Sequence, residues 1–494
     1  MNIQVLLPLV IYLAVMFSLA FYSRRRLSGS GSFLEEYFIG SRSMGGFVLA
    51  MTLVATYTSA SSFVGGPGVA YKMGLGWVLL AMIQLPTAWL TLGVLGKKFA
   101  IIARRVNAVT VNDILRERYQ SRWVVILGSL SLVLFFIAAM VAQFIGGARL
   151  LEGMTGLSYN MGLMFFASTV ILYTCIGGFR AVVLTDTVQG VVMMIGTVAL
   201  LIGTVHAGGG MEATVTTLRE IDPALVTPFG PNEFLAKPFI LSFWILVCFG
   251  VIGLPHSAVR CFGYRDSRSM HTAIVLSTVV VGVIMLGMHL SGALGRAILP
   301  EIAVGDKIIP ALSLTVLHPV VAGIFIAGPL AAIMSTIDSQ LILASAAIVK
   351  DLYLNYICPT ESEEEAEKLV KKLGSWTTLL IGIIVFLAAF RPPDLIVWLN
   401  LFAFGGMQAA FLWPMVLGLY WKRANAMGAL ASMVSGLVTY FYMVSFVKRF
   451  YGMHVIVPTL VISLMVFVVV SLATRRPDTN ILKLFWGRDR VSDK

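Results

Sequence analysis

Residues 52–68 read Thr-Leu-Val-Ala-Thr-Tyr-Thr-Ser-Ala-Ser-Ser-Phe-Val-Gly-Gly-Pro-Gly, which combines many hydroxyl side chains with a glycine-rich end. The stretch lies inside an apolar run at 44–69 that is long enough to cross a membrane. A helix of this composition is prone to break, and a broken helix exposes backbone carbonyls and half-helix ends in the middle of the bilayer. Such groups can coordinate a cation or an anionic part of a ligand. The alternative is that small and hydroxyl residues merely allow close helix packing.

The composition of the whole chain supports a membrane setting. The 494 residues are 58% hydrophobic and only 12% charged, with a mean hydropathy of +0.89. A soluble domain carries about 25% charged residues, and single soluble cores stop growing near 250–300 residues. The sequence therefore predicts an all-α polytopic membrane protein.

About thirteen apolar runs are long enough to cross roughly 30 Å of hydrocarbon. We expect them near 3–23, 44–69, 75–95, 124–148, 159–177, 184–207, 238–258, 273–293, 314–348, 375–390, 394–419, 426–447 and 456–473.

The distribution of basic residues predicts the orientation. The net charge is +12, but Met1–Gln4 holds no Lys or Arg, and the cluster Arg24-Arg25-Arg26 follows the first apolar run. We therefore expect a retained first helix, not a signal peptide, with its N-terminus outside. Most Lys and Arg residues, Arg260 among them, then fall in segments facing the cytoplasm, as does the C-terminus. The net positive charge therefore reflects the orientation of the chain in the membrane, and a nucleic-acid partner is not expected.

The sequence lacks the motifs of several classes of enzyme and pump. The four cysteines are irregularly spaced, the histidines form no HExxH pair, and no Walker A sequence occurs, so an ATP-driven pump would need a separate ATPase subunit. The outside loop near 208–237 and the loop around 350–374, with its acidic stretch Glu361–Glu367, are too small for a catalytic domain. We expect neither an enzyme nor a bound cofactor.

A second polar cluster lies in the ninth predicted span, at 331–339. Ala332, Ser335 and Thr336 are spaced three and four residues apart and share one helix face. Hydroxyl and carbonyl oxygens without charge suit a weakly bound monovalent cation. Asp338 lies one turn further toward the cytoplasm. Asp186 lies just inside the sixth span, where an alternative role as a helix N-cap or first-turn acid remains open.

Two long motifs bring a family resemblance. Tyr173–Ala181 and Gly418–Arg423, the latter running on through Gly428-Ala429 to Gly436, resemble the signatures of the sodium:solute symporter family. The resemblance covers about residues 1–475 and implies the inverted-repeat fold of the leucine-transporter type in a bacterial inner membrane. The implied units are a first helix with its basic cluster (1–26), a first five-helix repeat (27–210), an external loop (211–237), a second repeat (238–423), two further spans (424–474) and a cytoplasmic tail (475–494).

The resemblance also implies the ion site. Sodium as coupling ion would be held by the carbonyls of Ala55 and Thr58 together with Ala332, Ser335 and Thr336. Asp186 matches an acid implicated in sodium release, and we expect Asp338 either on the exit route toward it or protonated. Members that carry proline have an aspartate where this chain has Tyr57, which puts proline transport in doubt.

Other stretches, including Glu35–Gly46 and Gly250–His256, resemble the members that carry pantothenate. This substrate has a carboxylate, two hydroxyls, an amide and an apolar head, so its pocket should mix donors with apolar walls. Arg149 could attract the anion, but a structural or gating role is the favoured interpretation. Another small carboxylate or an amino acid remains an alternative cargo, and a sensor or channel without coupled uptake is a more distant one. The candidate substrate residues are Ser59, Ser62, Gln84, Gln143, Pro255 and Asn400.

Overall fold

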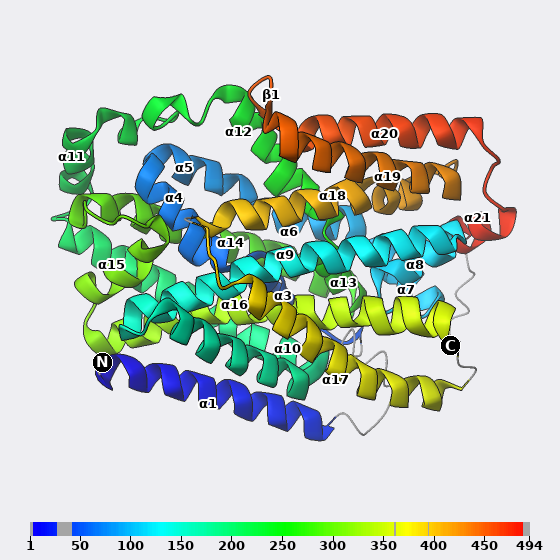
Figure 1. Ribbon diagram of the computed structural model, residues 1–494, viewed down its shortest axis with the longest axis horizontal. Helices are drawn as coiled ribbons and strands as arrows, with labels where there is room; N and C mark the ends of the chain where they lie inside the picture. Colours follow the sequence, from blue (N-terminus) through cyan, green and yellow to red (C-terminus); the bar gives the residue numbers. More distant parts are fainter. Residues whose placement is uncertain (1–2, 27–41, 360–361, 394, 488–494) are drawn as a thin grey trace.

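The computed structural model describes residues 3–26, 42–359, 362–393 and 395–487, and for some helical residues among them only the backbone is described. Part of the motif at 35–46, and the predicted tail beyond 487, lie outside these residues. Most long helices run along the long axis of the molecule (Figure 1). The start of α1 (Ile3–Arg26) and the helix α11 (Met211–Ile221) lie at one end of that axis, and α21 (Thr479–Trp486) lies at the opposite end.

Apolar helices lie at the positions of the predicted spans. In the described residues, nine helices are long and apolar enough to cross a membrane, two more crossings are bent helix pairs, and Leu7–Leu19 and Tyr159–Leu172 are shorter apolar helices. Each predicted span corresponds to one of these segments. The nine are Leu75–Arg105, Arg122–Thr155, Val182–Ala207, Ser267–Ile298, Pro319–Ile357, Glu364–Ala388, Ile396–Tyr420, Ala426–Val447 and Ile456–Ala473.

Most of these crossings are single long helices. They are α9 (Arg122–Thr155), α14 (Ser267–Ile298), α16 (Pro319–Ala346) continued by η11 (Ala347–Ile357), α17 (Glu363–Ala388), α18 (Ile396–Tyr420), α19 (Ala426–Tyr442) continued by η12 (Met443–Val447), and α20 (Ile456–Ala473). The element α10 (Tyr159–Ala207) contains two of the predicted spans, at Tyr159–Leu172 and Val182–Ala207. The crossing at Leu75–Arg105 is built from α5 (Leu75–Ala81), η3 (Met82–Gln84), α6 (Thr87–Leu90), η4 (Thr91–Gly96) and α7 (Lys97–Arg105).

Shorter elements connect the crossings. They are α8 (Val111–Tyr119), η5 (Pro223–Val226), η6 (Pro231–Glu233), η10 (Gly305–Lys307), α15 (Ile308–Val316) and a hairpin of β1 (Arg449–Phe450) and β2 (Met453–His454). The predicted external loop therefore contains the helix α11 and two short turns of helix.

Two sequence expectations need correction. The acidic stretch Glu361–Glu367 was expected to lie in a loop, but α17 begins within it. The Ser362 hydroxyl accepts a hydrogen bond from the Glu365 N–H, and Lys368 pairs with Glu364 one turn on. This cap and this ion pair both favour a helix here. The second correction concerns Asp186, which lies inside α10 and not at a helix start, so the N-cap alternative is wrong.

The second crossing is broken where the sequence predicted it. The helix α3 (Gly46–Tyr57) ends before the extended residue Thr58 (φ −87°, ψ 139°), and the chain resumes in η2 (Ser61–Gly65) and α4 (Gly66–Met73) at an angle of 67°. Hydroxyl groups favour the break because they compete for backbone partners. The Thr58 hydroxyl donates to the Val54 carbonyl, and the Ser59 hydroxyl accepts from the Ser61 N–H.

The seventh crossing is also broken, by a different cause. Lys237–Gly253, made of α12 (Lys237–Phe243), η7 (Trp244–Cys248) and η8 (Phe249–Gly253), meets Pro255–Phe262 at 47°. The second part consists of α13 (Pro255–Val259) and η9 (Arg260–Phe262). Pro255 disfavours a helical conformation of the residue before it, and Leu254 is extended (φ −96°, ψ 111°).

Close approaches of helix backbones hold the first break at the centre of the bundle. A Cβ on Gly146 of α9 would lie 2.5 Å from the Ala60 Cβ, and one on Gly65 would lie 2.8 Å from Ile396 of α18. A Cβ on Gly66 would lie 2.2 Å from the His289 ring of α14. Small residues are the usual means of bringing membrane helices this close. The break is therefore enclosed by α9, α14 and α18.

Candidate functional site

The break frees two backbone carbonyls that an intact helix would use. In an unbroken helix the Ala55 carbonyl would accept from the Ser59 N–H, but that N–H instead points to the Ser62 hydroxyl at 3.4 Å. The Ala55 carbonyl accepts from the Ser335 hydroxyl at 3.0 Å. The Thr58 carbonyl accepts from the Thr336 hydroxyl, also at 3.0 Å. The bent chain of the second crossing is thus joined to α16.

The Ala332 carbonyl completes a cluster of five oxygens. It accepts from Ser335 at 3.1 Å and from Thr336 at 2.8 Å. Ala55, Thr58, Ala332, Ser335 and Thr336 are all buried, so water does not compete for these oxygens. We name these five residues the oxygen cluster. The structure brings together the five residues that the sequence predicted for the ion.

A charged cluster lies about one turn further along α16. Asp186 accepts from the Thr52 hydroxyl at 2.6 Å and from the Arg260 guanidinium at 3.2 Å. Arg260 also donates to the hydroxyls of Ser339 (2.6 Å) and Thr56 (3.1 Å). Both charged side chains are at most 1% exposed. We name Asp186, Arg260, Asp338 and Ser339 the charged cluster; it joins α3, α10, η9 and α16.

Arg260 was not predicted to have any role. Sequence reasoning counted it among the basic residues of segments facing the cytoplasm, and the structure shows that its side chain is buried in the core. Its neighbours Ala258, Val259, Cys261 and Phe262 are all apolar or small, and this was the one signal that the arginine is not a surface residue.

Asp338 has a different environment from Asp186. The Thr174 hydroxyl donates to its Oδ1 in a short hydrogen bond. Its Oδ2 is buried and has no hydrogen-bond partner among the described residues. Asp338 therefore has one hydroxyl partner where Asp186 has a hydroxyl and a guanidinium.

A small cavity adjoins the first break. Of the predicted substrate residues, Ser59, Ser62, Gln84 and Asn400 line it. Its lining also includes aromatic and polar residues that sequence reasoning missed, namely Tyr57, Trp77, Phe243, His289 and Phe404. The Ser61 hydroxyl and the Trp77 indole nitrogen have no partner within the described part of the chain. These are groups that a polar ligand could satisfy.

The remaining candidates, Gln143 and Pro255, do not line this cavity, and neither does Arg149. Gln143 of α9 accepts from the Ala60 N–H at 2.7 Å and contacts Asn400 at 3.4 Å, so it links the first break to α18. Pro255 is buried at the start of α13. Arg149 pairs with Glu152 at 3.0 Å and stacks on Tyr159, in keeping with a structural or gating role.

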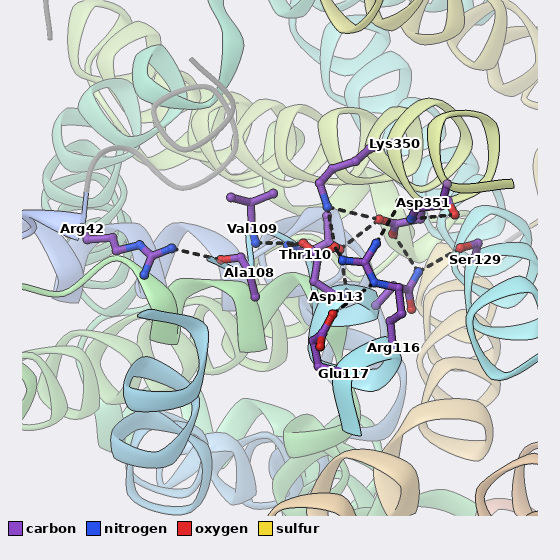
Figure 2. A network of polar contacts seen from close by, with 12 residues as sticks. Arg42, Ala108, Val109, Thr110, Asp113, Arg116, Glu117, Ser129, Lys350 and Asp351 are labelled. Carbon is purple, nitrogen blue, oxygen red and sulfur yellow. Dashed lines mark hydrogen bonds and ion pairs between the residues drawn. The ribbon is translucent and has the colours of Figure 1, made fainter. Parts of the chain in front are cut away.

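Another polar network fixes η11, the continuation of the helix α16 that carries the oxygen cluster (Figure 2). Lys350 of η11 pairs with Asp113 of α8, and Thr110 and Asn112 donate to Asp351 at 3.0 and 2.9 Å. Burial raises the pKa of Asp113, but the Lys350 ammonium outweighs it, so the pKa lies below its usual value. The end of the helix that carries the oxygen cluster is therefore anchored to α8 by opposite charges.

Comparisons with known proteins agree with this geometry. The model of the sodium:solute symporter family matches residues 37–436. A sodium/pantothenate symporter of Escherichia coli (strain K12) is 58% identical over 98% of this chain and 99% of its own. A sodium/pantothenate symporter of Haemophilus influenzae is 55% identical over 98% and 99%.

The fold has a solved counterpart. A Na+-coupled sialic acid symporter in a substrate-bound outward-open state superposes with a TM-score of 0.76 at 21% identity, covering 97% of this chain and 99% of the other. This likeness confirms the expected fold class, an all-α polytopic membrane protein of the leucine-transporter type. With a family match over most of its length and two full-length relatives above 50% identity, this chain belongs to the sodium:solute symporter family.

Proposed function

We propose that this protein is a sodium-coupled secondary active symporter that imports pantothenate by alternating access. The observation that carries the proposal is the 58% identity over nearly the full length of both chains to a sodium/pantothenate symporter. We place it in the bacterial inner membrane, with its N-terminus outside and its C-terminus in the cytoplasm, because the basic residues gather in alternate connecting segments. Sodium, pantothenate and the lipid bilayer are the partners that this function requires.

The oxygen cluster supports sodium as the coupling ion. Its two hydroxyls donate to three carbonyls, and rotation of each hydroxyl hydrogen would turn a lone pair inward toward a cation. Carbonyl and hydroxyl oxygens suit hard cations such as sodium. Because two of the carbonyls come from the break and three groups come from α16, an ion here would hold the two helices together. Loss of the ion would let them separate, which is the coupling that symport needs.

The cavity supports a substrate such as pantothenate. Trp77, Phe243 and Phe404 supply apolar walls for the dimethyl head, and Asn400 supplies an amide for the polar backbone. No Lys or Arg lines the cavity among the described residues. Neutral donors and the positive N-terminal end of the half-helix that begins at Ser61 would therefore have to balance the carboxylate.

The two broken crossings support an inverted repeat. One opens the unit assigned to 27–210 and the other opens 238–423, as expected if the two halves share a design. An odd number of crossings in each half turns the second upside down relative to the first, which suits alternating access. In this division the first helix (1–26), the loop 211–237, the spans within 424–474 and the tail 475–494 are additions to the repeats.

The test is uptake into proteoliposomes. Labelled pantothenate, proline and a set of small carboxylates are offered with and without an inward sodium gradient. We expect pantothenate alone to accumulate, and only with sodium. Equal accumulation without sodium would overturn coupling, and preference for an amino acid or another acid would overturn the substrate. Downhill flux that never exceeds equilibrium would favour a channel.

A further inference from the structure

A second pocket lies at the opposite end of the molecule from α11, the end that we predict to face the cytoplasm. It lies where α8, the start of α19 and the segment between α20 and α21 meet. It is lined by Arg118, Tyr119, Gln120, Asn425, Ala426, Met427, Thr474, Arg475, Arg476, Pro477, Asp478 and Ile481.

The positive charge of this pocket is not balanced by the protein. Arg475 and Arg476 are exposed, and Arg118 lines the wall beneath them. The one acidic residue, Asp478, already caps α21 by accepting from the Asn480 N–H at 2.8 Å. Three guanidinium groups thus face a single carboxylate that is engaged elsewhere.

Arg118 is the unusual member of the group. It is 1% exposed, and it donates to the carbonyls of Gly418 (2.7 Å) and Ala424 (2.8 Å) while its guanidinium lies over the rings of Tyr119 and Trp486. No carboxylate pairs with it among the described residues, and its Nη1 has no hydrogen-bond partner there. A buried charge without a counter-ion is destabilising, so an anion in the adjoining pocket would be favoured.

The surroundings point to a lipid as the source of that anion. Met427 lines the pocket and is 58% exposed, and the outward faces of α19 and α20 continue from it with exposed apolar side chains. These are Val434, Val438, Met465, Val469 and Leu472. A headgroup at Arg475 and Arg476 could therefore extend its acyl chains along α19 and α20.

We infer that this pocket binds the phosphate of an anionic membrane phospholipid. Guanidinium groups match phosphate oxygens in geometry, and basic pockets between membrane helices are sites of this kind. Arg118 also contacts the connection between α18 and α19. A bound lipid would therefore stabilise the joint of α8, α18, α19 and α21. This site is separate from the proposed transport site and does not depend on the identity of the cargo.

The test measures thermal unfolding of the full-length purified protein. Phosphatidylglycerol, phosphatidylcholine or inorganic phosphate is added to the detergent-solubilised wild type and to two variants. Arg475→Gln/Arg476→Gln removes the exposed charges of the pocket. Arg122→Gln/Lys422→Gln removes the same charge from exposed positions at the same end that do not line it.

We expect phosphatidylglycerol to raise the melting temperature of the wild type and of the control. The pocket variant should need at least about tenfold more lipid for the same rise, since stabilisation follows ligand concentration relative to Kd. An equal response to phosphatidylcholine, or an unchanged response of the pocket variant, would overturn the proposal. If inorganic phosphate reproduces the full shift, the ligand is a soluble phosphate and the lipid assignment is wrong.

Discussion

The oxygen cluster and the charged cluster sit on neighbouring turns of α16, yet they are built from opposite chemistry. Ser335 and Thr336 bring only hydroxyls to freed carbonyls of the first break. Asp338 and Ser339 lie beside a buried ion pair of Asp186 and Arg260. The first cluster has no charge of its own and can gain one from an ion. In the second, the Asp186 carboxylate is already paired with the Arg260 guanidinium, so we propose that this cluster positions helices and lies on the release route of the ion, without binding a second one.

Breaking the ion pair should have the largest effect. Arg260→Met leaves Asp186 buried without its counter-ion, which costs about 3–5 kcal/mol. We expect lost uptake and a clearly lower melting temperature of the purified protein. The double variant Arg260→Met/Asp186→Asn removes both charges and should recover much of the stability. A single variant as stable as the wild type would show that the pair does not anchor these helices.

Removing the hydroxyls of the oxygen cluster should act on sodium more than on substrate. Ser335→Ala/Thr336→Ala is expected to raise the sodium concentration for half-maximal uptake about tenfold or more, or roughly 1.4 kcal/mol. Ser345→Ala, a buried serine further along α16 that donates to the Gly374 carbonyl, is the matched control. Unchanged sodium dependence in a normally inserted double variant would remove these residues from the ion site.

Asp338→Asn should be milder than Asp186→Asn. The amide can keep the contact with Thr174, whereas the change at Asp186 leaves Arg260 without its carboxylate. We expect uptake by the Asp338 variant to stay within about threefold of the wild type, below ~0.7 kcal/mol. Initial rates of uptake into vesicles, corrected for the amount of inserted protein, measure this. The reverse order of severity would exchange the roles of the two acids.

The membrane potential is expected to have no effect on uptake, which makes this the smallest of the predicted effects. One sodium ion and one anionic substrate carry no net charge, so a gradient of tenfold contributes about 1.4 kcal/mol and the potential nothing. Each net charge would add about 2.3 kcal/mol per 100 mV. Uptake is measured while potassium and valinomycin clamp the potential. Strong stimulation by an inside-negative potential would mean that a second cation, or a neutral substrate, is carried.

Local patterns predicted much of this molecule. Hydroxyls and glycines between Thr52 and Gly68 indicated the first break, and the spacing of Ala332, Ser335 and Thr336 put them on one face. The apolar runs gave the crossings, because lipid imposes a length on each helix. These features depend on residues close together in the chain.

Contacts between residues far apart in the sequence could not be predicted from local patterns. Arg260 meets Asp186 over 74 residues and Ser339 over 79, and no periodicity carries that information. Gln143 was predicted to face the cavity. Only the fold shows that its side-chain oxygen instead accepts a hydrogen bond from the Ala60 N–H. Trp77 and His289 were missed because single aromatic or imidazole side chains in apolar helices are common as packing residues.

Because the oxygen cluster carries no charge, its ability to bind an ion should not depend on pH in acidic media. A carboxylate ligand can take up a proton in place of a metal ion once its pKa, about 4 when exposed and higher when buried, is approached. Hydroxyl and backbone carbonyl oxygens do not titrate in that range. If the oxygen cluster holds sodium, as we propose, protonation of these ligands would not displace the ion in acid. A cell in an acidic medium would then keep its uptake coupled to sodium.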